Sequence, residues 1–185
     1  MTTPASLRTL APALLLALLH TASMAAGRAH DHGHARLDIA VEGSRITLQM
    51  ASPLDNLLGF ERGPRTEAER QSAAALVSRL QGADALFKPD PAAQCRLATV
   101  ELESAALNLA PAPGRVEPEA KGVEHADLDA LIKFDCADAA RAAFIDVTLF
   151  DAFTRLKRID VQVATPKGQL KRTLVAPARR VSLVR

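Results

Sequence analysis

Apolar and polar residues alternate along long stretches of this chain, and the alternation limits what it can fold into. Every second residue is apolar over residues 37–41 and 46–50, on either side of a turn signal at Glu42-Gly43-Ser44-Arg45. The same period returns over residues 128–136. A strand with one face in the core and one face in solvent has this period of two. The pattern therefore predicts half-buried strands and a β-hairpin near the start.

The remaining elements are predicted from local signals. Thr66 and Glu69 form a capping-box pattern ahead of apolar residues at helical spacing, which predicts a helix over residues 66–81. A shorter helical turn is expected after Ser52-Pro53, ended by Gly59. The expected fold class is α+β and β-rich, with further strands at residues 94–103, 144–149, 159–163, 170–175 and 181–184.

The two halves of the chain resemble each other. His34-Ala35-Arg36-Leu37-Asp38 recurs as His125-Ala126-Asp127-Leu128-Asp129, and Pro53-Leu54-Asp55-Asn56-Leu57 has a counterpart at residues 149–153. Echoes in the same order indicate an internal repeat. We therefore expect two similar antiparallel β lobes, the first at residues 26–109 with the helix inserted and the second at residues 125–185. A Pro- and Gly-rich linker at residues 110–124 would join them.

Residues 1–25 have the layout of a cleavable secretory signal. Arg8 precedes a short apolar run at residues 10–19, and small residues at Ser23 and Ala25 precede the expected cut. A run of about ten residues is half of what a spanning helix needs. We therefore expect an exported protein with no stable membrane insertion after cleavage. Nucleic acid is not an expected partner, because 23 Lys and Arg nearly balance 21 Asp and Glu, and Trp and Tyr are absent.

Cys95 and Cys136 are the two cysteines of the chain, and they are too far apart for a CxxC motif. In an exported protein such a pair most simply forms one disulfide, and two buried, inert thiols are the alternative.

Clustered histidines are the main indication of function. His30, His32 and His34 lie within five residues, at or near the expected mature N-terminus. Imidazoles two residues apart share one side of an extended chain, and neutral imidazole suits Zn, Cu and Ni. The repeat places His125 at a position equivalent to His34, each at the start of a strand and on its polar face. The four histidines are therefore the candidate metal ligands, most simply for zinc.

Other interpretations of this end of the chain remain open. The histidines can be ordinary residues of a solvated polar terminus. If the leader is cut after Gly27, His30 becomes the third residue and, with the free amine, forms a square-planar copper or nickel site. No HExxH, Gly-rich phosphate loop or GxSxG motif is present. We expect no enzyme, and the alternative to metal binding is a metal-independent interaction module.

The chain resembles the ZrgA-like family of periplasmic proteins, which is linked to zinc uptake. The resemblance rests on residues 32–37, on the run Ser52-Pro53-Leu54-Asp55-Asn56-Leu57-Leu58-Gly59-Phe60-Glu61 with Pro64, on residues 146–151 and 158–160, and on both cysteines. Membership implies a non-catalytic periplasmic protein that binds zinc and helps supply the binding protein of a zinc ABC importer.

Two departures from the family pattern imply a lower metal capacity. Members often carry a long His- and Asp-rich tract between the halves, where residues 110–124 contain no histidine. The family also tends to have His after the Phe-Glu pair, where this chain has Arg62.

Overall fold

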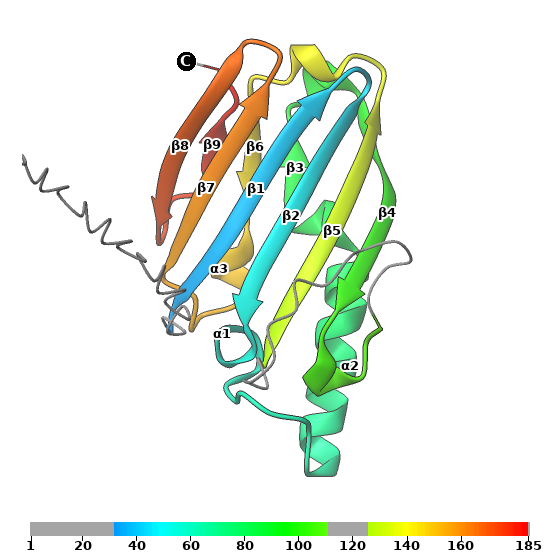
Figure 1. Ribbon diagram of the computed structural model, residues 1–185, viewed down its shortest axis with the longest axis vertical. Coiled ribbons are helices and arrows are strands. Elements are labelled where there is room, and N and C mark those ends of the chain that lie inside the picture. Colours follow the sequence, from blue (N-terminus) through cyan, green and yellow to red (C-terminus); the bar gives the residue numbers. More distant parts are fainter. Residues whose placement is uncertain (1–31, 111–125, 185) are drawn as a thin grey trace, which may run out of the picture.

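The computed structural model describes residues 32–110 and 126–184 (Figure 1). The predicted leader and nearly all of the predicted linker lie outside these ranges. The strands are β1 (His34–Glu42), β2 (Arg45–Pro53), β3 (Phe87–Pro89), β4 (Cys95–Glu103), β5 (Asp127–Cys136), β6 (Phe144–Val147), β7 (Arg158–Thr165), β8 (Gly168–Val175) and β9 (Arg180–Ser182). The α-helices are α1 (Leu54–Leu58), α2 (Glu67–Gln81) and α3 (Leu149–Ala152). The predicted β-rich fold is confirmed, and none of the described helices is long and apolar enough to cross a membrane.

The strands form one large and one small sheet. The large sheet has the order β4-β5-β2-β1-β7-β8, and the small sheet has the order β3-β6-β9. Neighbouring strands are antiparallel except β1 and β7, which run parallel. The hairpin β1–β2 follows the predicted turn, since Glu42 pairs with Arg45, and β7 and β8 form a second hairpin in which Thr165 pairs with Gly168.

The structure does not confirm the predicted internal repeat, and the two halves do not form two separate antiparallel β lobes. Strands of both halves share each sheet, because β5 pairs with β2 and β4, and β7 pairs with β1. The repeat makes β5 and β6 equivalent to the hairpin β1–β2, but β5 and β6 lie in different sheets and form no hairpin. In this arrangement both edges of β1 and of β2 are hydrogen-bonded to a neighbouring strand. The apolar faces of both halves also pack into one core.

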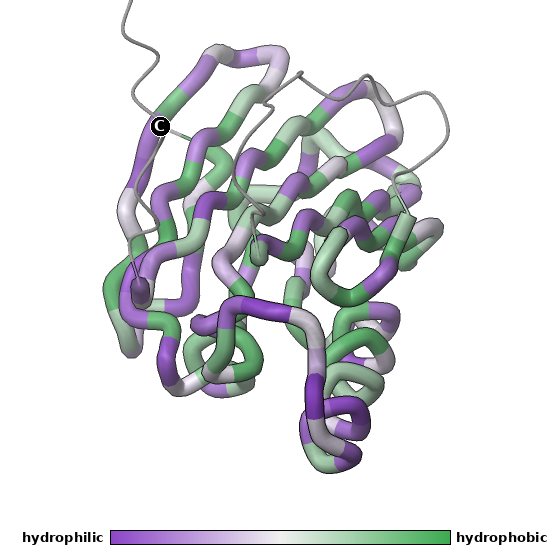
Figure 2. The backbone as a smooth tube through the Cα atoms, turned by 60° about the horizontal axis from the view of Figure 1, so that its bottom comes forward, coloured by the Kyte–Doolittle hydropathy of each residue, from purple (hydrophilic) through white to green (hydrophobic). Residues whose placement is uncertain are grey.

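The predicted alternation sets which face of the large sheet is buried. Inward-facing side chains such as Leu37, Leu48 and Ile132 are fully buried. They pack with the small sheet and α2, which lie behind the large sheet in Figure 1. Figure 2 shows the alternation of hydrophilic and hydrophobic residues along its strands. The opposite face is polar and open, with Asp38, Gln49, Gln162 and Lys171 around a shallow depression.

The short strand β3 is not among the strands that the sequence predicts, and it contains Pro89. Phe87 is fully buried, and the strand pairs with β6 through Pro89 opposite Ile145. Burial of one aromatic side chain therefore holds three residues in the small sheet despite the proline.

The two outer strands of the large sheet differ in how their free edges are built. The pairing of β4 with β5 shifts register between Leu97 and Thr99, which is a β-bulge. On the other side, β8 carries the exposed side chains of Lys171 and Arg172.

Helix α2 begins at the predicted capping box. The Thr66 hydroxyl accepts a hydrogen bond from the Glu69 N–H, and the Glu69 carboxylate accepts from the Thr66 N–H, both at 3.2 Å. Arg62 adds two hydrogen bonds to the same carboxylate at 2.8 and 2.9 Å, and the Arg65 N–H donates a further one. These donors, Arg62 first, lower the pKa of Glu69 from 4.5 to about 2.

We expect Glu69→Gln to destabilise the protein at neutral pH, and the difference from wild type to shrink as the medium is acidified. The pKa of Glu69 lies lower in the folded protein than in the unfolded chain, so its charge stabilises the fold above pH 4.5 and loses this effect as pH falls toward about 2. Urea denaturation of both proteins between neutral and acidic pH measures this. Glu67→Gln, which alters an exposed pair with Arg70, is the control. A difference that stays constant with pH would contradict the expectation.

The predicted disulfide is confirmed. Cys95 and Cys136 lie opposite each other on β4 and β5 and are joined across 41 residues of sequence. The bond ties the outer strand to the sheet and restricts the unfolded chain.

Replacing both cysteines with serine should lower the free energy of unfolding by about 3–4 kcal/mol, the loop-closure contribution for a loop of this length. Urea denaturation of the oxidised wild type and the double variant measures the difference. Dithiothreitol should destabilise the wild type and leave the variant unchanged. Equal stability of the two proteins under oxidising conditions would contradict the expectation.

Candidate functional site

The segment His32-Gly33-His34 enters the large sheet between two elements that both bind its backbone. The Gly33 N–H donates to the Asn56 side-chain oxygen at 2.6 Å, and the Asn56 side-chain NH2 donates to the His34 carbonyl at 2.7 Å. The Gly33 carbonyl accepts from the backbone N–H groups of Lys157 and Arg158 at 2.8 and 2.9 Å. The backbone on both sides of Gly33 is therefore fixed.

The residues around Asn56 fix the start, the packing and the end of helix α1, and so place Asn56 beside Gly33. Pro53 has φ −52°, which suits the start of a helix, and Leu54 buries its side chain completely. Gly59 ends the helix with φ 84°, a left-handed conformation that glycine adopts readily. Asn56 is 1% exposed, and its NH2 also donates to the Ser52 hydroxyl at 3.2 Å, so the buried amide is satisfied.

An ion pair ties α1 to the chain just before β7. The Arg155 guanidinium donates to both Asp55 carboxylate oxygens at 2.8 and 2.9 Å and to the Asp55 carbonyl at 2.9 Å. The Asp55 side chain is 12% exposed, so this pair is well shielded on the carboxylate side. The same stretch supplies Lys157 and Arg158, which bind Gly33. The ion pair therefore holds both sides of the Gly33 segment together.

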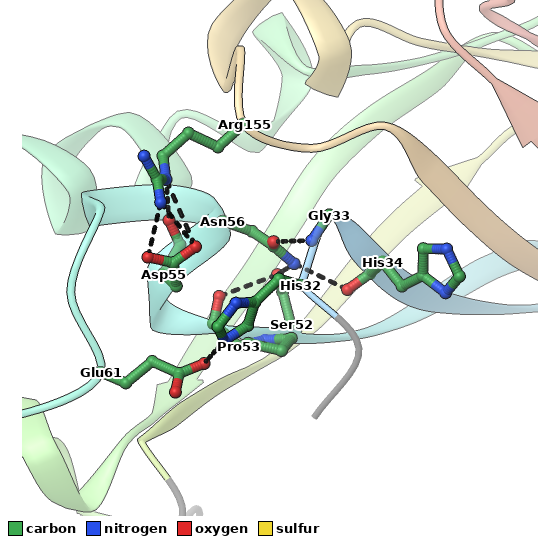
Figure 3. Close-up of polar contacts among 9 residues, drawn as sticks. All are labelled: His32, Gly33, His34, Ser52, Pro53, Asp55, Asn56, Glu61 and Arg155. Carbon is green, nitrogen blue, oxygen red and sulfur yellow. Dashed lines mark hydrogen bonds and ion pairs between the residues drawn. The ribbon is translucent and has the colours of Figure 1, made fainter. Parts of the chain in front are cut away.

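His32 lies against a carboxylate that sequence reasoning did not single out as a site residue. Its Nε2 is 3.0 Å from a carboxylate oxygen of Glu61, which follows α1 (Figure 3). The His32 side chain is 62% exposed and that of Glu61 34%. A carboxylate that holds one imidazole nitrogen orients the ring and leaves the second nitrogen available to a metal ion.

His34 takes a different direction from His32. It begins β1 opposite Arg158 of β7, half-buried on the polar face, as predicted. It lies near Asp160, whose pKa is lowered mainly by the hydrogen bond from Arg158, with a smaller contribution from His34. Figure 3 shows the His34 ring pointing away from His32 and Glu61. Gly33 has φ 82°, so the backbone here is not the extended chain on which alternate side chains share one side.

The other two predicted ligands, His30 and His125, lie outside the described residues. Ala126, which follows His125, is described, and its carbonyl accepts a hydrogen bond from the Leu54 N–H of α1 at 2.8 Å. β1 and β5 flank β2 and start at the same end of the sheet, about 10 Å apart by strand spacing. Ala126 therefore lies at the same end of the sheet as His32 and His34.

Within residues 32–110 and 126–184, no group of three or more His, Cys, Asp and Glu side chains is close enough to hold a metal ion. The described part of the site is therefore the His32–Glu61 pair and the framework that holds it. The Arg62 guanidinium is bound to the Glu69 carboxylate. This contact directs its side chain into the α2 cap.

Only some of the residues that hold the His32–Glu61 pair in place could be found from the sequence. Asp55, Asn56 and Glu61 lie in the run that carries the family resemblance, so that run indicates importance without a role. No sequence signal pointed to Arg155, which is 100 residues from Asp55 and meets it only in the folded chain.

Comparison with known protein families matches residues 29–183 to the family described as ZrgA family zinc uptake protein. Among curated proteins, a sequence search finds none that matches this chain. The family match covers the whole of the described fold, including His32, Glu61 and the α1 framework. The chain therefore belongs to the ZrgA family of zinc uptake proteins.

Proposed function

We propose that this protein is an exported zinc-binding accessory of a zinc uptake system, which buffers zinc in the periplasm or delivers it to the binding protein of an importer. The family match supports a role in zinc uptake, and the signal-like leader supports export. The single observation that carries the metal-binding part is the His32–Glu61 pair at the end of the large sheet. The proposal assigns the protein no catalytic step.

His32 is the central ligand of the proposed site. Its ring is exposed, and Glu61 fixes its orientation. An accessible, preoriented imidazole beside a carboxylate suits zinc, which binds His nitrogen and Asp or Glu oxygen. His30 and His125 remain the proposed additional ligands from the histidine pattern of the sequence, whereas the direction of the His34 ring separates His34 from this site.

We expect zinc to bind the protein purified from the periplasm, and both His32→Ala and Glu61→Gln to weaken binding roughly tenfold or more, the usual effect of losing a ligand or its orienting carboxylate. Competition with a chromogenic zinc chelator measures the affinity. Glu67→Gln, an exposed carboxylate on α2, is the matched control and should bind zinc as the wild type does.

Unchanged affinity in both His32→Ala and Glu61→Gln would contradict the proposed site. Metal analysis of the periplasmic protein tests the identity of the ion, because copper binds imidazole sites more tightly than zinc in simple titrations. Copper or nickel in place of zinc would contradict the proposed cargo, and a metal-free protein that binds none of the three would contradict the function.

A further inference from the structure

We infer that Asn56 is a positioning residue for the metal site, an inference that rests on the proposed function. Asn56 does not touch the metal in this proposal. Its carboxamide fixes the backbone on both sides of Gly33 and thereby sets the direction in which the His32 imidazole leaves the chain. The two hydrogen bonds, at 2.6 and 2.7 Å, are among the shortest at this end of the sheet.

The geometry separates this role from ordinary core packing. Asn56 is 1% exposed, and its amide is hydrogen-bonded to the backbone of Gly33 and His34. A buried amide is costly unless all its groups are bonded, and an apolar side chain would serve packing alone equally well. An amide side chain carries both an acceptor and a donor. Its oxygen accepts from the Gly33 N–H while its NH2 donates to the His34 carbonyl, which an apolar side chain could not do.

Asn56 and Glu61 lie five residues apart and both bind the segment His32-Gly33-His34. Asn56 holds the backbone next to His32, and Glu61 holds its ring. Fixing both reduces the conformational freedom that His32 would lose on binding an ion, so the site is preorganised. Removing the backbone anchor should therefore weaken zinc binding even though every proposed ligand is still present.

Gly33 provides an independent way to disturb the same segment. Its φ of 82° is unfavourable for a residue with a side chain, and a Cβ there would lie 3.3 Å from Cγ of Lys157. Lys157 is flexible, so Gly33→Ala should shift the segment without preventing folding. If Asn56 acts by holding this segment, the effects of Asn56→Ala and Gly33→Ala on zinc affinity should not add.

The test measures zinc affinity and thermal stability in wild type, Asn56→Ala, Gly33→Ala and the double variant. Ile46→Ala is the control, because Ile46 is fully buried and pairs with Val41, about 23 Å along β1 from His34. We expect Asn56→Ala to bind zinc roughly tenfold more weakly than wild type, as for other residues that orient ligands. The double variant should be no weaker than the weaker single variant. Ile46→Ala should lose thermal stability and keep its zinc affinity.

A second readout follows the His32 ring directly. Long-range proton–nitrogen NMR correlations of the imidazole in the zinc-free protein should report the Glu61 contact in wild type and Ile46→Ala, and its loss in Asn56→Ala. Wild-type affinity in Asn56→Ala, or losses that add in the double variant, would overturn the inference while leaving the proposed function intact. If Asn56→Ala does not fold, wild-type affinity in Gly33→Ala would overturn it in the same way. A wild-type protein that binds no zinc would instead overturn the proposed function.

Discussion

The pairing of β1 with strands from both halves of the chain is the interaction on which the site depends. β2 and β7 flank β1 in register, and β5 follows on the other side of β2. This order brings the end of β2 and the starts of β1, β5 and β7 to one end of the large sheet (Figure 1). His32, α1, Ala126 and Arg155 meet there although they are far apart in sequence.

Helix α1 is stabilised by the contacts that it makes at this end of the large sheet. A five-residue helix has too few internal hydrogen bonds to be stable alone. Its stability comes from tertiary contacts: the burial of Leu54, the bond from Leu54 to Ala126 and the pair between Asp55 and Arg155. Asn56 completes the set by binding the segment of Gly33. The site and the local fold are therefore one cooperative unit.

Features that depend on residues close together in the sequence could be predicted. Features that depend on residues far apart in the sequence could not. Alternation identified the buried faces of β1, β2 and β5, and the Thr66–Glu69 pattern identified the start of α2, because both signals are periodic or short-range. A period of two shows which face of a strand is buried but does not show which strand lies beside it, so two lobes were expected where strands of both halves share each sheet. The divergence of His32 and His34 depends on the backbone angle at Gly33, and the pair of Asp55 with Arg155 depends on topology.

The outer strands of the large sheet have a consequence for the behaviour of the protein at high concentration. An open strand offers backbone groups to which a second molecule can hydrogen-bond in register. The irregularity between Leu97 and Thr99 interrupts such a register on β4, and Lys171 and Arg172 bring like charges together when two β8 strands approach. Both features disfavour the association of sheets into larger assemblies.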